Sequence, residues 1–190
     1  MPDADDVDKV SVYDRDEIVQ AVTSSYQFLS TLHIPSSAIR YPPLDGWPDV
    51  DGRTYGWLNK NDRVIDLMRH LPYLSRDHLG SYQIYMNTGA IDYNGEHVQR
   101  SMRFAAEHDV EVDLLDIEPP LDYTYIPPHV LSLASETSGA NGYFFLIDTD
   151  RGTITVYSLA GEGFLIEHGG TVKTDVRTRR IHHTRPMTIN

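Results

Sequence analysis

Cysteine is absent from this 190-residue chain, and three kinds of chemistry are excluded with it. Without a thiol there is no disulfide, no cysteine nucleophile and no thiolate zinc site. The sequence also has no apolar run near the length of about 18 residues that a membrane span needs. Its first residues lack the basic and apolar regions of a signal peptide. We therefore expect a protein of the cytoplasm, or of the nucleus and cytoplasm, with no contact to a membrane.

Positive charge is scarce. The chain has 16 Lys and Arg residues against 28 Asp and Glu residues, a net charge of -12. Binding to nucleic acid or to an anionic membrane draws on clustered cations, so neither partner is expected. The acidic start and the basic end suggest two disordered tails, residues 1–12 and residues 177–190, on either side of a domain formed by residues 13–176.

Periodicity in the sequence predicts the elements of that domain. Apolar residues recur at helical spacing in three segments, which we predict as helices: Asp14 to near His33, Asn61 or Asp62 to Pro72, and Glu96–His108. A further short helix is predicted from Pro127 or Pro128 to near Gly139. Strand patterns occur at Gln83–Thr88, briefly within "TGAIDYNG", and at Val110–Leu114, Tyr143–Ile147, Thr153–Tyr157, Phe164–Glu167 and Thr171–Val176. Together they predict a single α+β domain, a mainly antiparallel sheet with helices packed on it.

Two stretches resemble known proteins. These are "KNDRVIDLMRHLPYL" at Lys60–Leu74, preceded by Gly46 and Trp47, and "IPPHVLSLASETSGANGYFFLIDTDRGTI" at Ile126–Ile154. They resemble a group of uncharacterised fungal proteins and, more distantly, the SUKH superfamily of yeast cell-wall-synthesis regulators and bacterial toxin-immunity proteins. The resemblance implies a SUKH-like α+β fold used mainly for protein binding, and it supplies no catalytic residues.

Motifs for metal, phosphate or nucleophile chemistry do not occur. The chain has nine histidines, but no H-E-x-x-H, EF-hand, P-loop or G-x-S-x-G pattern. The adjacent His182 and His183 point to opposite sides of an extended chain and cannot share one ion without a bend. We expect no metal and no cofactor.

General acid and base chemistry needs only a few placed groups. Asp92, Tyr93 and His97 are close in sequence, and Asp148 ends the clearest strand. If the protein is an enzyme, these four are its candidate catalytic residues. The structural alternative is that Asp92 and Asp148 cap turns and that His97 lies on an exposed helix.

Aromatic residues are concentrated around a polar segment, Arg40–Asn61, that contains both tryptophans. Large amphipathic rings are what interfaces and pockets use at their centres. The candidate binding residues are Trp47, Tyr55, Trp57, Tyr73 and Tyr85. Alternatively, Trp47 and Trp57 pack back onto the core and fix the loop.

The leading hypothesis is a non-catalytic intracellular protein-interaction module with an unknown protein partner. The alternative is a small cofactor-independent enzyme, a cyclase, isomerase or hydrolase, that acts on a small organic substrate through His, Asp and Tyr. A homodimer through an exposed sheet edge is a third hypothesis.

Overall fold

Side-chain caps fix the start of the first two helices. The computed structural model describes residues 13–75, 80–110, 117–118, 126–137 and 141–158, together with the backbone of 164–167 and 172–173. In helix α1 (Arg15–Ser30) the Asp14 carboxylate accepts hydrogen bonds from the backbone N–H groups of Asp16 and Glu17. In helix α2 (Asp62–His70) the Asn61 side chain accepts from Val64 N at 2.9 Å. Both predicted N-termini are confirmed.

The predicted apolar stripes of these helices are buried, with one exception. Helix α1 buries Ile18, Val22 and Tyr26, and α2 buries Val64, Ile65, Leu67 and Met68. The same helical spacing also includes Leu32. It is 63% exposed, because the helix ends at Ser30, before this residue.

The main sheet is antiparallel, and each of its strands pairs with the next strand along the chain. Its order is β3 (Gln83–Tyr85), β4 (Thr88–Ala90), β5 (Val130–Glu136), β6 (Phe144–Asp148), β7 (Thr153–Tyr157), β8 (Phe164–Glu167) and β9 (Val172–Lys173). A second small sheet pairs β1 (Ile39–Arg40) with β2 (Tyr73–Leu74). The described residues therefore confirm an α+β domain with antiparallel sheets.

The segment predicted as a short helix from Pro127 or Pro128 is strand β5, so that prediction was wrong. Strand β5 lies inside the sheet, between β4 and β6. Its residues from Val130 to Ala134 are all buried. A strand covered on both faces loses the alternation of apolar and polar residues that marks a strand in the sequence.

The predicted strand Gln83–Thr88 is a hairpin. Strands β3 and β4 are joined through Asn87, which has a φ of 51°. Asn accepts this left-handed backbone more readily than most residues, and so it allows the turn. Of the other predicted elements, 111–116, 138–140, 168–171, 174–176 and both tails lie outside the described residues.

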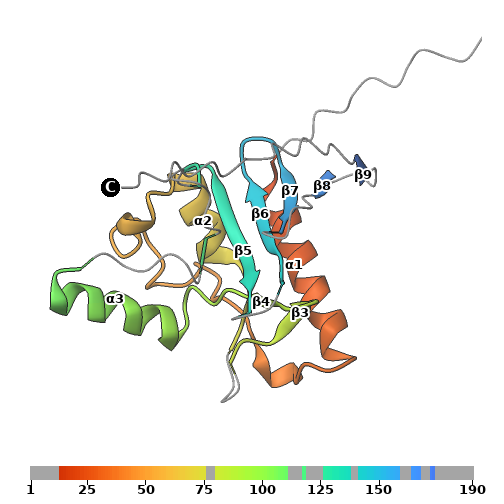
Figure 1. Ribbon diagram of the computed structural model, residues 1–190, viewed down its shortest axis with the longest axis horizontal. Coiled ribbons are helices and arrows are strands. Elements are labelled where there is room, and N and C mark those ends of the chain that lie inside the picture. Colours follow the sequence, from red (N-terminus) through yellow and green to blue (C-terminus); the bar gives the residue numbers. More distant parts are fainter. Residues whose placement is uncertain are drawn as a thin grey trace, which may run out of the picture.

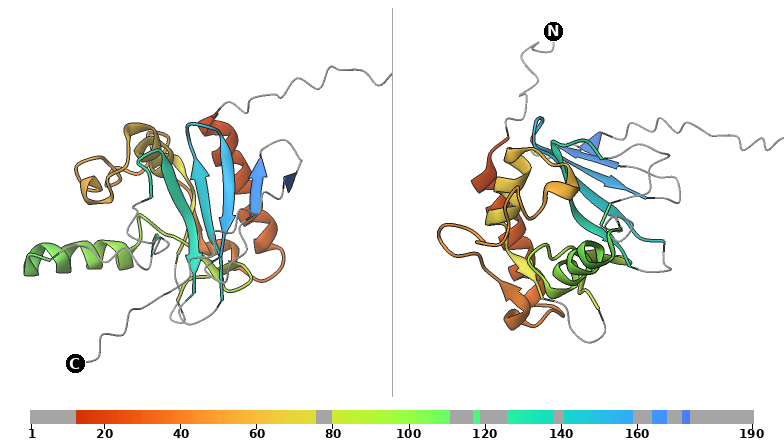
Figure 2. Two further views of the ribbon diagram at one scale, coloured as in Figure 1. Left: turned by 45° about the horizontal axis from the view of Figure 1, so that its top comes forward. Right: turned by 90° about the vertical axis from the view of Figure 1, so that its left-hand side faces the viewer.

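The domain has two layers (Figures 1 and 2). Helices α1 and α2 lie on one face of the main sheet, and helix α3 (Glu96–His108) projects from its edge. The main core between the layers includes Leu131, Leu133 and Ile147 of the sheet. Residues that alternate with these, including Phe144 and Leu146, belong to a smaller cluster on the opposite face of the sheet.

Gly142 lies where the chain passes close to the β3–β4 turn, and it supplies a test of this packing. A Cβ at Gly142 would lie 2.1 Å from the carbonyl oxygen of Asn87, whereas a Cβ at Gly52 would meet nothing within 4 Å. We expect Gly142→Ala to lower the free energy of unfolding by about 1–3 kcal/mol, because backbone would have to move. The control, Gly52→Ala, is expected to change it by less than about 1 kcal/mol. Equal urea midpoints for the two variants would contradict this packing.

Candidate functional site

Trp47 fixes the Pro-rich loop that follows β1. Its indole N–H donates to Leu71 O at 2.8 Å, and its backbone N–H donates to Arg69 O at 2.8 Å. The indole ring stacks on Tyr73 with 5.9 Å between ring centroids. Trp47 and Trp57 are half-buried, and both pack against the main core. Both tryptophans therefore have a structural role in holding residues 41–58 onto the domain.

A buried ion pair lies beneath this loop. Arg40 Nη2 contacts both carboxylate oxygens of Asp92 at 2.6 Å, and the Asp92 side chain is only 5% exposed. The Arg40 guanidinium also lies 5.4 Å from the centroid of the Trp47 ring. Because Arg40 is in β1 and Asp92 follows β4, this pair ties the small sheet to the main one. Gly95 leaves the room it needs, since a Cβ there would lie 2.6 Å from Asp92 Oδ2.

Three tyrosines form the centre of the core behind the ion pair. The ring of Tyr93 contacts the rings of Tyr55 and Tyr73 edge to face, with centroids 6.2 and 6.3 Å apart. Each hydroxyl donates to a backbone carbonyl: Tyr55 to Tyr93, Tyr73 to Met68, and Tyr93 to Ser132. Tyr55 and Tyr73 were predicted as contact residues, but they are at most 1% exposed and so cannot be reached by a partner in this conformation. A buried tyrosine hydroxyl usually needs a hydrogen-bond partner inside the protein, and these carbonyls supply it.

Three of the four candidate catalytic residues have a structural partner, and the fourth lies on the surface. Asp92 pairs with Arg40, and Tyr93 donates to Ser132 O. His97 lies on the exposed side of α3. Asp148 accepts from two backbone N–H groups of the β6–β7 turn and from the Arg151 side chain. Burial alone would raise the pKa of Asp148, but these hydrogen bonds bring it below its ordinary value.

A buried Lys–Glu pair was not predicted from the sequence. Lys60 Nζ lies 2.5 Å from Glu118 Oε1, and the two side chains are 0% and 7% exposed. Lys60 also donates to Ile126 O at 3.3 Å. Burial lowers the pKa of Lys60 and raises that of Glu118, because both charges lose water. No motif marks either residue, and they are far apart in the chain.

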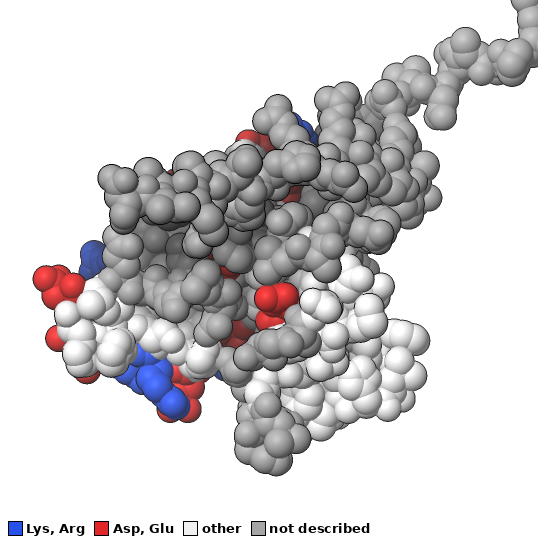
Figure 3. All heavy atoms as spheres, in the orientation of Figure 1, with Lys and Arg blue, Asp and Glu red and all other residues white. Residues whose placement is uncertain are grey.

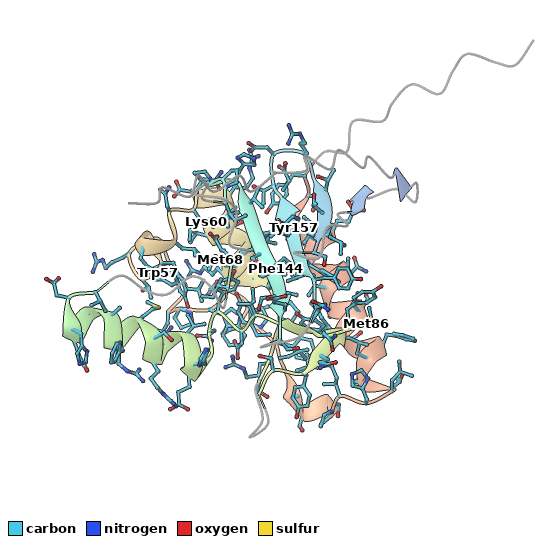
Figure 4. The ribbon with its side chains drawn as sticks, viewed as in Figure 1. Trp57, Lys60, Met68, Met86, Phe144 and Tyr157 are labelled. Atoms are coloured by element: carbon cyan, nitrogen blue, oxygen red, sulfur yellow. The ribbon has the colours of Figure 1, made fainter. Side chains whose placement is uncertain are left out.

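Large apolar side chains are also exposed on the outer surface. Eight large apolar side chains are exposed in the described part of the chain, and two of them, Phe104 and Val110, lie on or just after α3. The other six come from three segments, and we call them the uncharged face: Phe28 and Leu32 at the end of α1, Tyr41 and Leu44 in the loop after β1, and Tyr85 and Met86 in the β3–β4 hairpin. Figure 4 places Met86 beside the lower end of α1. Tyr85, 52% exposed, is the one predicted contact residue that belongs to this face.

Two hydrogen bonds show that the parts of the face are neighbours. Gln27 Nε2 of α1 donates to the Tyr41 hydroxyl at 3.3 Å on one flank. His33, just after α1, hydrogen-bonds through Nε2 to Gln83 O of β3 at 3.0 Å on the other. The loop that carries Tyr41 and the hairpin that carries Tyr85 therefore border the same end of the helix.

Four of the six side chains of this face lie in two stretches of sequence that carry no charged residue. No Asp, Glu, Lys or Arg occurs from Ile18 to Ile39 or from Gly80 to Ile91. In Figure 3 the surface over the lower end of α1 and the β3–β4 hairpin is white, while red and blue side chains gather at the α3 end. The charge-free stretches are the sequence signal that could have located the face.

The described residues lack the features of a metal site and of a membrane-spanning helix. They contain no group of three or more His, Asp or Glu side chains placed to hold a metal ion. No helix among them has the length and apolar character to cross a membrane.

The pairing of Lys60 with Glu118 can be tested by removing one of the two charges or both. We expect Lys60→Met to lower the free energy of unfolding by about 3 kcal/mol, because it leaves a buried carboxylate without a partner. The double variant Lys60→Met with Glu118→Leu removes both charges and should recover most of that loss. Urea unfolding at neutral pH measures both. A double variant as unstable as the single one would contradict the pairing.

The buried tyrosines predict how the stability of the fold changes at alkaline pH. Burial raises the pKa of Tyr26, Tyr73 and Tyr93 above the ordinary value, and it raises that of the half-buried Tyr13 to about 12. A pKa that is higher in the folded state gives stability that is complete below about pH 10, where unfolded tyrosine titrates, and is lost as the pH rises above it. We expect part of the tyrosinate absorbance to appear only together with the loss of circular dichroism. Ionisation of all twelve tyrosines near pH 10 with the fold intact would contradict the burial.

Known proteins do not add to the interpretation of these residues. No family model matches the chain, and comparison with curated proteins and with solved structures found no match. The SUKH-like resemblance therefore stays a prediction.

Proposed function

We propose that this chain is a non-catalytic intracellular protein-interaction module whose contact surface is the uncharged face. The observation that carries the proposal is that six of the eight exposed large apolar side chains come from the end of α1, the loop after β1 and the β3–β4 hairpin, and that hydrogen bonds join the loop and the hairpin to the end of α1. Scattered exposed apolar residues are normal, but a contiguous apolar patch on a protein surface marks a binding site. The SUKH-like resemblance, itself a proposal, points to the same class of function.

The composition of the face suits a protein partner. Phe28, Tyr41 and Tyr85 offer aromatic rings, and Met86 offers a flexible thioether side chain. Aromatic residues and Met are enriched in the centres of protein interfaces, where charged residues are depleted. The polar neighbours on α1, which include Ser24, Gln27 and Thr31, are uncharged and exposed.

The elements that carry the face are fixed to the core, and this also supports a binding role. Helix α1 packs on the core through Ile18, Val22 and Tyr26. The loop with Tyr41 is fixed from below by Trp47. Side chains presented on rigid elements lose little conformational freedom on binding, so more of the contact free energy remains for affinity.

The enzyme hypothesis is supported less well. An acid–base site needs groups that converge on one substrate. Asp92, Tyr93 and Asp148 instead have separate structural partners. Lys60 and Glu118 do converge, with pKa values shifted by burial, but the Lys60 side chain is fully enclosed. We therefore propose structural roles for these residues.

Site-specific photo-crosslinking in the cells that make the protein tests the proposed function. A photoreactive phenylalanine analogue would replace Phe28 or Met86, and Phe104 is the matched control because it is 56% exposed and lies on α3. We expect discrete protein adducts from positions 28 and 86 and none of the same mass from position 104. The proposal fails if all three positions give the same adducts, or if none gives any.

A further inference from the structure

We infer that the partner of the uncharged face is a second copy of this chain, related to the first by a two-fold axis. This inference rests on the proposed function and names its partner. In such a dimer the same patch on both copies is buried, so the patch has to complement itself.

Charge is the first argument for a second copy. The chain carries a net charge of -12, so most approaches of two copies bring like charges together. Four of the six side chains of the uncharged face, Phe28, Leu32, Tyr85 and Met86, lie in the two stretches that lack charged residues. Among the described residues near the other two, Asp45 is exposed beside Leu44, and Arg40 is paired with Asp92. Two copies can thus meet at the end of α1 and at the β3–β4 hairpin without burying a charge from these stretches.

A charged partner would fit the same face less well. A basic partner, which the acidic chain attracts at long range, would find no carboxylate among the six side chains that define it. Each of its cations would lose water there without gaining an ion pair. A second copy presents the same face, and so it offers a matching set of apolar and uncharged polar groups.

The area of the face agrees with a stable dimer. The six side chains are between 51% and 102% exposed, so together they offer on the order of 800 Å2, which is what one partner contributes to an interface of standard size. Phe28 lies in the last turns of α1, and Leu32 lies just after the helix. The chain at Tyr41 is joined to this end of the helix through Gln27, and the hairpin that carries Tyr85 and Met86 is joined to it through His33.

The edge of the main sheet would lie inside this interface. Strand β3 is the first strand of the sheet, and in the described residues it pairs with β4 alone. An edge strand is open to unwanted pairing unless something covers it. A second copy placed on Tyr85 and Met86 would cover β3.

Sedimentation velocity of the purified full-length chain at increasing concentration tests this inference. We expect the wild type to form a dimer, and Phe28→Glu to raise the dissociation constant at least about tenfold, because a central aromatic residue becomes a buried charge. Phe104→Glu, the matched control, should dimerise like the wild type. Met86→Glu tests the face from its other flank, and it serves if Phe28→Glu does not fold by circular dichroism.

Cross-linking locates the contact independently. The chain has no cysteine, so Met86→Cys introduces the only thiol. A short bismaleimide should link two copies of Met86→Cys and should not link two copies of Phe104→Cys.

The inference is wrong if the wild type stays monomeric at every concentration, or if its dimer is unchanged by both Phe28→Glu and Met86→Glu. These outcomes differ from failure of the proposed function. A monomeric chain that still gives adducts with another protein from position 28 keeps the proposed function and excludes the second copy. Absence of any adduct in cells removes the function itself.

Discussion

The contact between Arg40 and Asp92 is the interaction on which the rest of this structure depends. It connects the small sheet to the segment after β4 through two contacts at 2.6 Å, with the Asp92 side chain 5% exposed and the Arg40 side chain 33% exposed. Removing Arg40 would leave the buried Asp92 carboxylate without this partner, which typically costs about 3–5 kcal/mol. The same guanidinium lies over Trp47, which in turn binds the end of α2 through Leu71 and Arg69. One ion pair thus fixes the loop of residues 41–46 relative to both layers.

The position of that loop determines which of its side chains are exposed on the outer surface. Because it is fixed from below by Trp47, Tyr41 and Leu44 remain outside, beside the end of α1. The hairpin of β3 and β4 borders the same end from the other side. Rings in the segment 40–61 therefore differ in their positions: Tyr55 and the two tryptophans hold the fold, and the exposed Tyr41 belongs to the proposed contact surface.

Much of the fold could be predicted from the sequence where local chemistry determines it. Asp14 and Asn61 begin helices because their side chains satisfy free N–H groups, and the β6–β7 hairpin follows from two runs of β-branched and aromatic residues around Asp148 and Gly152. Strand β5 was missed because burial on both faces removes its periodicity. The Lys60–Glu118 pair could not be predicted, since only the folded chain brings the two residues together. The uncharged face left a weaker signal, an absence of charged residues, where the prediction relied on the presence of rings.

The central proposal is that a second copy of this chain buries the uncharged face, and hydroxyl-radical footprinting of the purified chain tests it most directly. The oxidation of Phe28, Tyr85 and Met86 would be measured at rising protein concentration, with Phe104 as the internal reference because it is similarly exposed. The account predicts that oxidation of the three face residues falls with concentration while that of Phe104 stays constant. Constant oxidation of the face, or a fall at Phe104 alone, would contradict it.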